Sequence, residues 1–146
     1  MQKGNPKGIQ GLKDLTRNEI TFINRQMGSG TRILLDHTLK TLSLKSRDIH
    51  GYEKEEYTHM AVASAVAGKI VDAGLGIFPA AKAMNLDFIP VSKERYDLVL
   101  PSIYFGDERI ERVIETIRSD EFKTIVSQMG GYDVSRTGEE LKESSE

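Results

Sequence analysis

The sequence predicts an α/β fold with a largely parallel or mixed sheet. Short segments rich in β-branched and aromatic residues alternate along the chain with segments whose apolar residues recur at helical spacing. A glycine-rich turn stands between the first predicted strand and the helix after it. With 146 residues, of which 38% are apolar and 29% charged, the chain is long enough for one domain with a hydrophobic core.

The first predicted unit is a strand, a glycine-rich loop and a helix. Residues 4–9 form a connector that contains Gly and Pro, and a short helical turn over Gly11–Thr16 follows it. Glu19–Asn24 has the composition and length of a strand, and the loop RQMGSG comes directly after it. The helix after this loop is predicted from three leucines at i, i+4 and i+7, which are Leu35, Leu39 and Leu42.

The middle of the chain predicts further strands and helices. Ile49–Tyr52 has the composition of a short strand, and Glu55–Glu56 open a helix that ends at Gly68, since acidic residues complement the start of a helix dipole. Ile70–Ile77 predicts a buried strand, and Pro79 suits the first turn of a short helix. Two further strands are predicted over Leu86–Val91 and Tyr96–Leu100.

Two amphipathic helices close the predicted fold. Apolar residues repeat at i, i+3, i+4 and i+7 over residues 110–117 and again over 122–129. Gly130 and Gly131 end the second helix as a C-cap. We therefore expect residues 1–136 to form the folded domain and residues 137–146, which are too polar to bury, to form a disordered tail.

The composition limits the classes of site and partner. The chain has no Cys, which removes disulfides and thiol catalysis, and its three His fit no metal-ligand spacing, so we expect no metal and no cofactor. No apolar run approaches the ~20 residues that a membrane-spanning helix requires. No hydrophobic stretch follows the N-terminal lysines either, so we expect a cytoplasmic protein without a signal peptide.

The charge is distributed unevenly along the chain. Residues 1–47 carry nine Lys or Arg against three acidic residues, whereas the remainder carries eleven against nineteen, and the net charge is −2. A local anion site in an otherwise acidic protein explains this asymmetry, and so does fluctuation in a small window. The sequence has no recognition helix rich in Arg, Lys, Asn or Gln, so we expect no direct contact with nucleic acid.

The stretch Arg25–Thr31 carries the strongest chemical signal. A helix N-terminus has backbone N–H groups without intrahelical partners and a partial positive charge. Glycines on both sides of Ser29 let a ligand approach the backbone, Ser29 and Thr31 add hydroxyl donors, and Arg25 adds a forked cationic donor. Together with the amide of Gly30, these groups predict a site for an oxyanion or a carboxylate that needs no metal.

A structural explanation competes with this prediction. Ser29 between two glycines is also a common helix N-cap, and the loop has neither the Walker nor the G-x-G-x-x-G spacing. Thr58 and His59 stand where the next helix begins, so they are weaker candidates for the same cleft. Asp72 ends or interrupts a strand at the carboxyl edge, where it would repel an anion unless it orients donors such as Arg25. A structural role therefore leads for Asp72.

Arg25–Thr31 also carries a family resemblance, because it matches the pattern R-x-x-G-S-G-T. This pattern resembles phosphate-binding members of the type II periplasmic-binding-protein fold. Over nearly its whole length, the chain resembles more closely the branch related to molybdate-binding proteins. Three longer strings carry this closer resemblance: NRQMGSGTRILLD, GYEKEEYTHMAVASAVAGKIVDAGLG and AAKAMNLDFIPVSKERYDLVLP. That branch is often fused to molybdopterin-biosynthesis proteins or to helix-turn-helix regulators.

The resemblance implies two α/β lobes with a ligand cleft between them. The usual N-terminal strands and helices of the first lobe are not in this chain, which resembles the second lobe, with a single mixed sheet, plus the C-terminal helices. The positions that the resemblance implies as ligand-facing are Arg25, Ser29, Gly30 and Thr31, then Thr58 and His59, then Asp72.

Three functions compete at this point. The leading hypothesis is non-catalytic binding of a small anion, similar to molybdate or tungstate, by a protein of a molybdenum-cofactor pathway. The alternative is the effector-sensing domain of a transcriptional regulator, with a small organic ligand. The third is an interaction module, in which the missing first lobe or a second copy of the chain covers exposed apolar faces. No Ser–His–Asp spacing is discernible, so an enzyme is the least favoured class.

Overall fold

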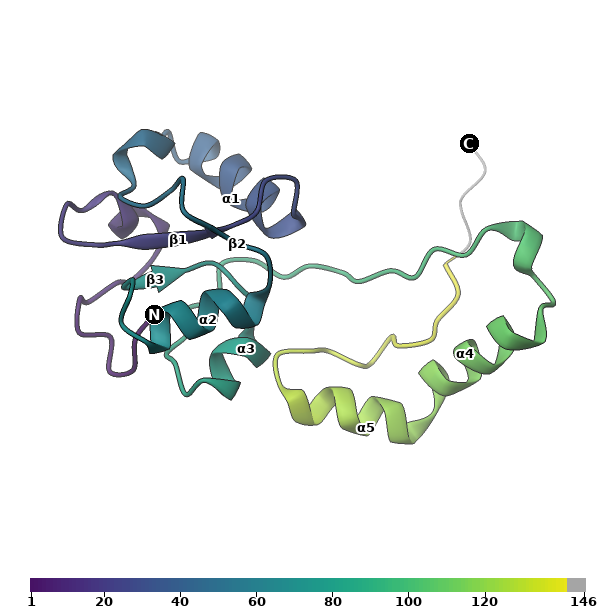
Figure 1. The fold of residues 1–146 in the computed structure, drawn as a ribbon. Helices are drawn as coiled ribbons and strands as arrows, with labels where there is room; N and C mark the ends of the chain where they lie inside the picture. The colour runs from purple at the N-terminus through teal and green to yellow at the C-terminus, as the bar shows by residue number, and fades with distance from the viewer. Residues whose placement is uncertain (142–146) are drawn as a thin grey trace. The chain divides into compact units, whose positions relative to one another are not determined.

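The fold was obtained as a computed structural model, which describes residues 1–141. The chain forms two compact units, Met1–Lys93 and the chain from Glu94 onward (Figure 1). The predicted α/β class is confirmed. The assignment of residues 1–136 to one lobe stays a prediction, and the predicted tail extends into residues 142–146, which lie outside the described residues.

Strands and helices alternate in the first unit, whereas the described part of the second unit has helices joined by irregular chain and no strand. In chain order the elements of the first unit are the 3₁₀ helix η1 (Leu12–Thr16), β1 (Phe22–Arg25), α1 (Gly30–Thr41), the 3₁₀ helix η2 (Ser46–Asp48), β2 (Glu55–Glu56), α2 (His59–Ala67), β3 (Ala73–Gly74) and α3 (Phe78–Ala83). The second unit holds the 3₁₀ helix η3 (Ser102–Tyr104), α4 (Glu108–Arg118) and α5 (Asp120–Met129). Each helix predicted from apolar spacing is confirmed, as is the helical turn before β1.

The sheet of the first unit consists of three parallel strands in the order β2-β1-β3. β2 pairs with the carboxyl half of β1, with Asn24 opposite Glu55, and β3 pairs with the amino half, with Phe22 opposite Ala73. Parallel strands bring their carboxyl ends to one edge of a sheet, so the loops that follow β1 and β2 are neighbours.

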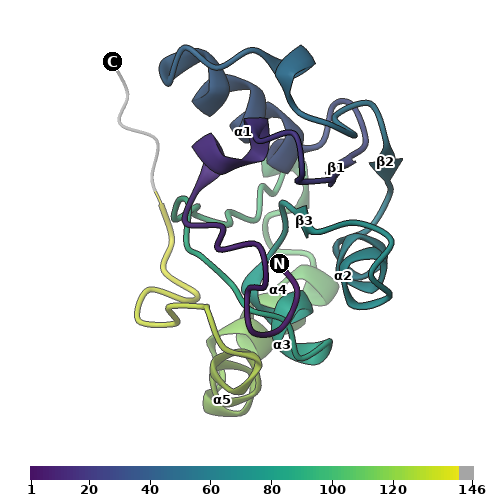
Figure 2. The same cartoon turned by 90° about the vertical axis from the view of Figure 1, so that its left-hand side faces the viewer.

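The two faces of β1 bury different side chains. Phe22 packs in one core cluster with Leu35 of α1, whereas Ile23 packs in another with Val62 of α2. Successive side chains of a strand point to opposite faces, and α1 and α2 accordingly lie on opposite sides of the sheet (Figures 1 and 2). The central strand is therefore buried on both faces, as its unbroken run of buried residues shows.

Both helices that flank the sheet begin at a side-chain cap. Ser29 Oγ accepts a hydrogen bond from the backbone N–H of Arg32 at 3.2 Å, and Thr58 Oγ1 accepts one from the N–H of Ala61 at 3.0 Å. Each cap replaces an intrahelical bond that the first turn of a helix lacks. Because the caps follow β1 and β2, the N-termini of α1 and α2 both lie at the carboxyl edge of the sheet.

Two predicted strands are wrong in position or length. Ile49–Tyr52 is a turn after η2, in which the N–H of Tyr52 bonds back to the carbonyl of Ile49 at 3.2 Å. The second strand lies instead at Glu55–Glu56, which was expected to open a helix. The strand predicted over Ile70–Ile77 is reduced to Ala73–Gly74. Both outer strands are short because each pairs with only one half of the four-residue β1.

Two further predicted strands, Leu86–Val91 and Tyr96–Leu100, are not formed in the structure. Both have strand composition, but neither pairs with a strand in the part of the chain that the structure describes. Leu86 packs instead against the apolar cluster beside α2, and Tyr96 is 95% exposed. Strand composition without a hydrogen-bonding neighbour does not make a sheet.

The second unit leaves much of its apolar surface accessible. Asp107 caps α4 and Ser119 caps α5, and the two helices contact each other. Neither helix contains a fully buried residue, and Val113, Ile125 and Met129 are each about half exposed. Across residues 1–141, no helix combines the length and the apolar character needed to span a bilayer.

Gly51 provides a sharp test of how the chain packs against β1. Its φ is +96°, and a Cβ at this position would lie 2.2 Å from the carbonyl oxygen of Phe22. We expect Gly51→Ala to lower the free energy of unfolding by about 3 kcal/mol, measured by urea denaturation, because the turn must move away from β1. Gly11→Ala is the matched control, since its backbone is extended and a Cβ there meets open space. Equal losses in the two variants would contradict this packing.

Candidate functional site

The chain changes direction at the carboxyl edge of β1 and β2. The loop after β1 leads to α1 on one face of the sheet, and the loop after β2 leads to α2 on the other face (Figures 1 and 2). In open parallel sheets, ligands collect in the crevice that such a switch point creates. We use the name switch crevice for this edge of the sheet together with the two loops and the first turns of α1 and α2. Six of the predicted site residues lie on its two loops and first helical turns: Arg25, Ser29, Gly30, Thr31, Thr58 and His59.

Arg25 joins the ends of the two strands. It is only 8% exposed, and its Nη2 donates to the carbonyl of Tyr57 at 2.9 Å. Its Nε donates to the carbonyl of Glu56 at 3.3 Å and to Oε1 of Gln26 at 3.1 Å. All three acceptors are neutral, and within residues 1–141 Arg25 has no ion pair and its Nη1 has no hydrogen bond. The switch crevice therefore holds a buried positive charge without a counter-charge.

The first turn of α1 adds backbone donors to the crevice. Gly28, at a φ of +83°, turns the chain so that Ser29 caps the helix. The capping explanation for Ser29 is thus confirmed, although the hydroxyl hydrogen makes no bond among the described residues. The N–H groups of Gly30 and Thr31 have no intrahelical partner, because they precede the first N–H that a helix can satisfy. They bring the partial positive charge of the α1 dipole to the crevice.

The first turn of α2 repeats this arrangement on the other face. Thr58 uses its hydroxyl oxygen to cap the helix, so its position next to the crevice also has a structural reason. The N–H groups of His59 and Met60 are left without intrahelical partners. Two helix N-termini and one arginine therefore converge on the loops that follow β1 and β2.

His59 is the only titratable side chain among the six predicted residues whose charge changes near neutral pH. Its ring is about half buried. Burial and the nearby Arg25 guanidinium lower the pKa of His59 below its ordinary value. The imidazole is therefore neutral at neutral pH, and the positive charge of the crevice comes from Arg25 and the helix ends.

A second buried arginine holds the crevice loops in position. Arg32 is 5% exposed, and its Nη1 donates to the Glu55 carboxylate at 2.9 Å. Its Nε pairs with Asp36 at 3.2 Å, and its guanidinium stacks on the Tyr52 ring at 4.1 Å. Burial, and then the hydrogen bond that Tyr52 donates to Asp36, raise the pKa of Tyr52. Two carboxylates balance Arg32, which makes it a structural arginine, in contrast to Arg25.

The sequence analysis did not identify this cluster around Arg32. The spacing of Arg32 and Asp36, at i and i+4 on a predicted helix, was the available signal. No sequence pattern indicated the contacts of Arg32 with Glu55 and Tyr52, because these contacts form only when β2 aligns beside β1.

Comparison with known proteins decides the family of this chain. Residues 1–118 match the PBP superfamily domain, and this match covers most of the chain. The chain belongs to the PBP superfamily.

The curated relatives of this PBP-superfamily chain are themselves uncharacterized. YvgK of Bacillus subtilis (strain 168) is 41% identical over 143 residues, which make up 98% of this chain and 46% of YvgK. A protein encoded in the 5′ region of a 2Fe-2S ferredoxin gene of Clostridium pasteurianum is 37% identical over 112 residues, or 76% of this chain and 99% of that relative. The chain thus spans about half of YvgK and nearly all of the second protein. No solved structure matches it significantly.

Asp72 does not join the other predicted residues of this PBP-superfamily chain. It was expected at the carboxyl edge, and this is wrong because β3 begins after Asp72. Its Oδ2 accepts hydrogen bonds from the N–H and the hydroxyl of Thr21, both at 2.8 Å, on the amino side of the sheet. Burial opposes its ionisation, but the two bonds from Thr21 outweigh burial and lower the pKa of Asp72. Asp72 ties β3 to β1.

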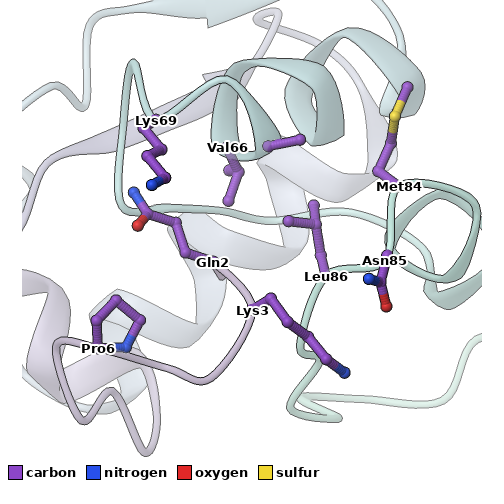
Figure 3. Close-up of a pocket in the computed structure, with 9 residues that line it drawn as sticks. Gln2, Lys3, Pro6, Val66, Lys69, Met84, Asn85 and Leu86 are labelled. Atoms are coloured by element: carbon purple, nitrogen blue, oxygen red, sulfur yellow. The ribbon is translucent and has the colours of Figure 1, made fainter.

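The structure also has a groove that the sequence did not predict. It has a volume of about 550 Å³ and lies on the amino side of the sheet, where Gln2 Nε2 donates to the Val71 carbonyl ahead of β3. Residues that line it include Gln2, Lys3, Val66, Lys69, Met84, Asn85 and Leu86 (Figure 3). None of the predicted site residues lines it. Neither this groove nor any other part of residues 1–141 brings together three His, Asp or Glu side chains that could hold a metal ion.

The placement of Asp72 predicts a structural phenotype. We expect Asp72→Asn to lower the free energy of unfolding by about 1–2 kcal/mol in urea denaturation, because the amide replaces an ionised acceptor of two hydrogen bonds. Anion binding at the switch crevice, measured by calorimetry, is expected to stay unchanged. A variant that loses anion affinity but keeps its free energy of unfolding would show instead that Asp72 belongs to the binding site. Thr21→Val is the matched variant. It removes the hydroxyl that donates to Oδ2 and that also accepts a bond from the N–H of Asp72 at 3.1 Å, so it is expected to lower the free energy of unfolding by a similar amount.

The lowered pKa of His59 predicts how stability depends on pH. Below the ordinary pKa of histidine, the unfolded chain binds the proton more readily than the folded chain, so the free energy of unfolding falls as the pH falls. We expect His59→Gln to flatten this dependence between about pH 7 and pH 5, measured by urea midpoints. His37→Gln, at an exposed position of α1, controls for the substitution itself. A slope that His59→Gln leaves unchanged would contradict the burial of the neutral ring.

Proposed function

We propose that the switch crevice binds a small oxyanion, or the carboxylate of a small ligand, without catalysing a reaction. The observation that carries this proposal is the guanidinium of Arg25, which is nine-tenths buried and has no carboxylate partner among the described residues. Membership of the PBP superfamily supports a ligand-binding function.

The energetics favour Arg25 as the main anchor of the anion. A hydrogen bond to a charged group contributes about 1.5–3 kcal/mol, whereas a neutral one contributes about 1 kcal/mol. The amides of Gly30 and Thr31 add neutral bonds, and each nearby helix dipole adds up to about 1 kcal/mol. An anion at Nη1 of Arg25 would also supply the counter-charge that residues 1–141 do not provide there.

We propose that a second surface completes the site. Ligand sites usually bury most of the ligand, whereas the donors of the switch crevice all come from one edge of one sheet. The first lobe that the family resemblance implies would cover the other side of the ligand, and a second copy of the chain is the other candidate. YvgK is about twice as long as the segment that this chain matches, which leaves room for such a lobe in that relative.

The finer part of the proposal concerns the ligand and the pathway. We propose a molybdate-like or tungstate-like anion and a role in a cytoplasmic molybdenum-cofactor pathway. This proposal rests on the resemblance of the longer strings, NRQMGSGTRILLD, GYEKEEYTHMAVASAVAGKIVDAGLG and AAKAMNLDFIPVSKERYDLVLP, to the branch related to molybdate-binding proteins. The alternative is an effector-sensing domain of a transcriptional regulator. One observation favours it: Met27 and Tyr57, on the two loops of the crevice, are 79% and 75% exposed and offer apolar surface to an organic ligand.

Substitution of Arg25 tests the proposed function. We expect Arg25→Ala to weaken anion binding by about 1–3 kcal/mol, because the anion loses a charged, forked donor. Isothermal titration with molybdate, tungstate, sulfate, phosphate and benzoate measures this loss and separates the inorganic ligands from the organic one. Amide shifts of Gly30 and Thr31 in NMR spectra report whether the anion sits at the start of α1.

Arg47→Ala is the matched control, because Arg47 is an exposed arginine of the first unit, on η2. It is expected to leave binding unchanged, and urea denaturation of both variants separates binding from folding. An Arg25→Ala variant that unfolds the chain would be replaced by Arg25→Lys, which keeps the charge and loses the fork. If none of the five anions binds to the wild-type chain or shifts the two amides, the proposal is wrong.

A further inference from the structure

A second groove of the first unit collects part of the positive charge of residues 1–47. It has a volume of about 630 Å³ and lies between the end of α1, the turn after it and η2. Three of the nine cationic residues of this segment line it, Lys40, Lys45 and Arg47, and all three are exposed. Within residues 1–141 neither lysine has an ion pair, and Arg47 meets only Asp48, at 3.8 Å. We use the name basic groove for this surface.

The floor of the basic groove is apolar and aromatic. Leu39 is almost fully buried, and Leu44 and Tyr52 pack against the same core cluster. The one carboxylate of the lining, Asp36, already pairs with Arg32 and accepts a hydrogen bond from the hydroxyl of Tyr52. Exposed charges around an apolar centre are typical of a surface that binds another protein.

The complementary charge lies on α4 in the second unit. Glu108, Glu111 and Glu115 stand at i, i+3 and i+7, so their carboxylates share one face over about 10 Å of the helix axis. All three are exposed, and in the described part of the chain none has an ion pair, not even with the neighbouring Arg112. Like charges at this spacing destabilise a helix, so a cationic partner would relieve their repulsion. We use the name acidic face for these three residues.

The acidic face fits the basic groove better than a nucleic acid does. A phosphate backbone would meet the carboxylate of Asp36 and a chain whose net charge is −2. The acidic face brings its carboxylates to the cations of the rim. Ile114, three residues after Glu111 and on the same side of α4, adds an apolar side chain for the floor.

We infer that a second copy of this chain places the acidic face of its α4 on the basic groove. This inference is independent of anion binding at the switch crevice. Each copy has one groove and one acidic face, so two copies that exchange the contact make it twice and close as a dimer. Because all the charges involved are exposed, the association is weak and falls as the salt concentration rises.

Sedimentation equilibrium of the full chain measures this association. We expect a monomer–dimer equilibrium at about 0.02 M salt whose association constant falls about tenfold at about 0.5 M salt, because salt screens exposed charges. The groove variant combines Lys40→Glu with Lys45→Glu, and the helix variant combines Glu111→Lys with Glu115→Lys. Each is expected to weaken dimerisation about tenfold at low salt, since like charges then face each other across the contact.

The control variant combines Lys69→Glu with Lys93→Glu. It changes the net charge by the same amount as the groove variant, at two exposed positions that do not line the basic groove. We expect it to dimerise like the wild-type chain. This result would separate the local effect of the groove from a general increase in negative charge.

A mixture of the groove variant and the helix variant tests whether the contact lies between copies. In a mixed dimer, the reversed groove meets the reversed acidic face, and the native groove meets the native acidic face. Both contacts are then matched, whereas each variant alone has two mismatched contacts. We expect the mixture to dimerise about tenfold more tightly than either variant alone.

Three outcomes would overturn the inference: a chain that stays monomeric at low salt, a dimer that neither variant weakens, and a mixture that associates no better than its components. Urea denaturation of each variant identifies a loss of folding. In that case the single changes Lys45→Glu and Glu111→Lys replace the double ones, with the same expected directions. None of these outcomes depends on whether the switch crevice binds an anion.

Discussion

The guanidinium of Arg25 is held by the carbonyl oxygens of Glu56 and Tyr57, and this interaction connects the carboxyl ends of β1 and β2. It uses the hydrogen-bonding capacity of the side chain without neutralising its charge. A carboxylate in place of these carbonyls would have produced an ordinary buried ion pair. The proposed site depends on the neutral partners, because they leave the charge of Arg25 at the edge of the sheet. The N-termini of α1 and α2 add partial positive charge at the same edge.

Arg25 and Arg32 show how similar side chains acquire different roles. Both are more than nine-tenths buried, and they are seven residues apart in the chain. Arg32 meets the carboxylates of Glu55 and Asp36 and stacks on an aromatic ring, so its charge is used inside the fold. Among the residues that the structure describes, the Arg25 guanidinium donates only to neutral oxygens. The balanced arginine therefore fixes α1 against β2, whereas the described residues leave the charge of the other arginine without a carboxylate partner.

Local patterns were enough to predict the strand–loop–helix unit around Ser29, because capping and helical spacing act over a few residues. The same patterns failed for the other strands. Glu55–Glu56 has poor strand propensity and Tyr96–Leu100 has good propensity, yet only the first forms a strand. Backbone pairing with β1 stabilises Glu55–Glu56, and a pairing partner is distant in sequence and invisible to a local pattern.

The sequence by itself determined the α/β class, the start of α1 at Ser29 and the presence of a loop with glycines and hydroxyl side chains after an arginine, since each depends on neighbouring residues. The tertiary structure alone decided that Asp72 binds Thr21 at the opposite end of the sheet. It also decided that, within residues 1–141, Arg25 has no carboxylate partner and Nδ1 of His59 is buried without a hydrogen bond. These are properties of charges and polar atoms brought together across the sheet. Their energies depend on burial and on partners tens of residues away, which only the folded chain specifies.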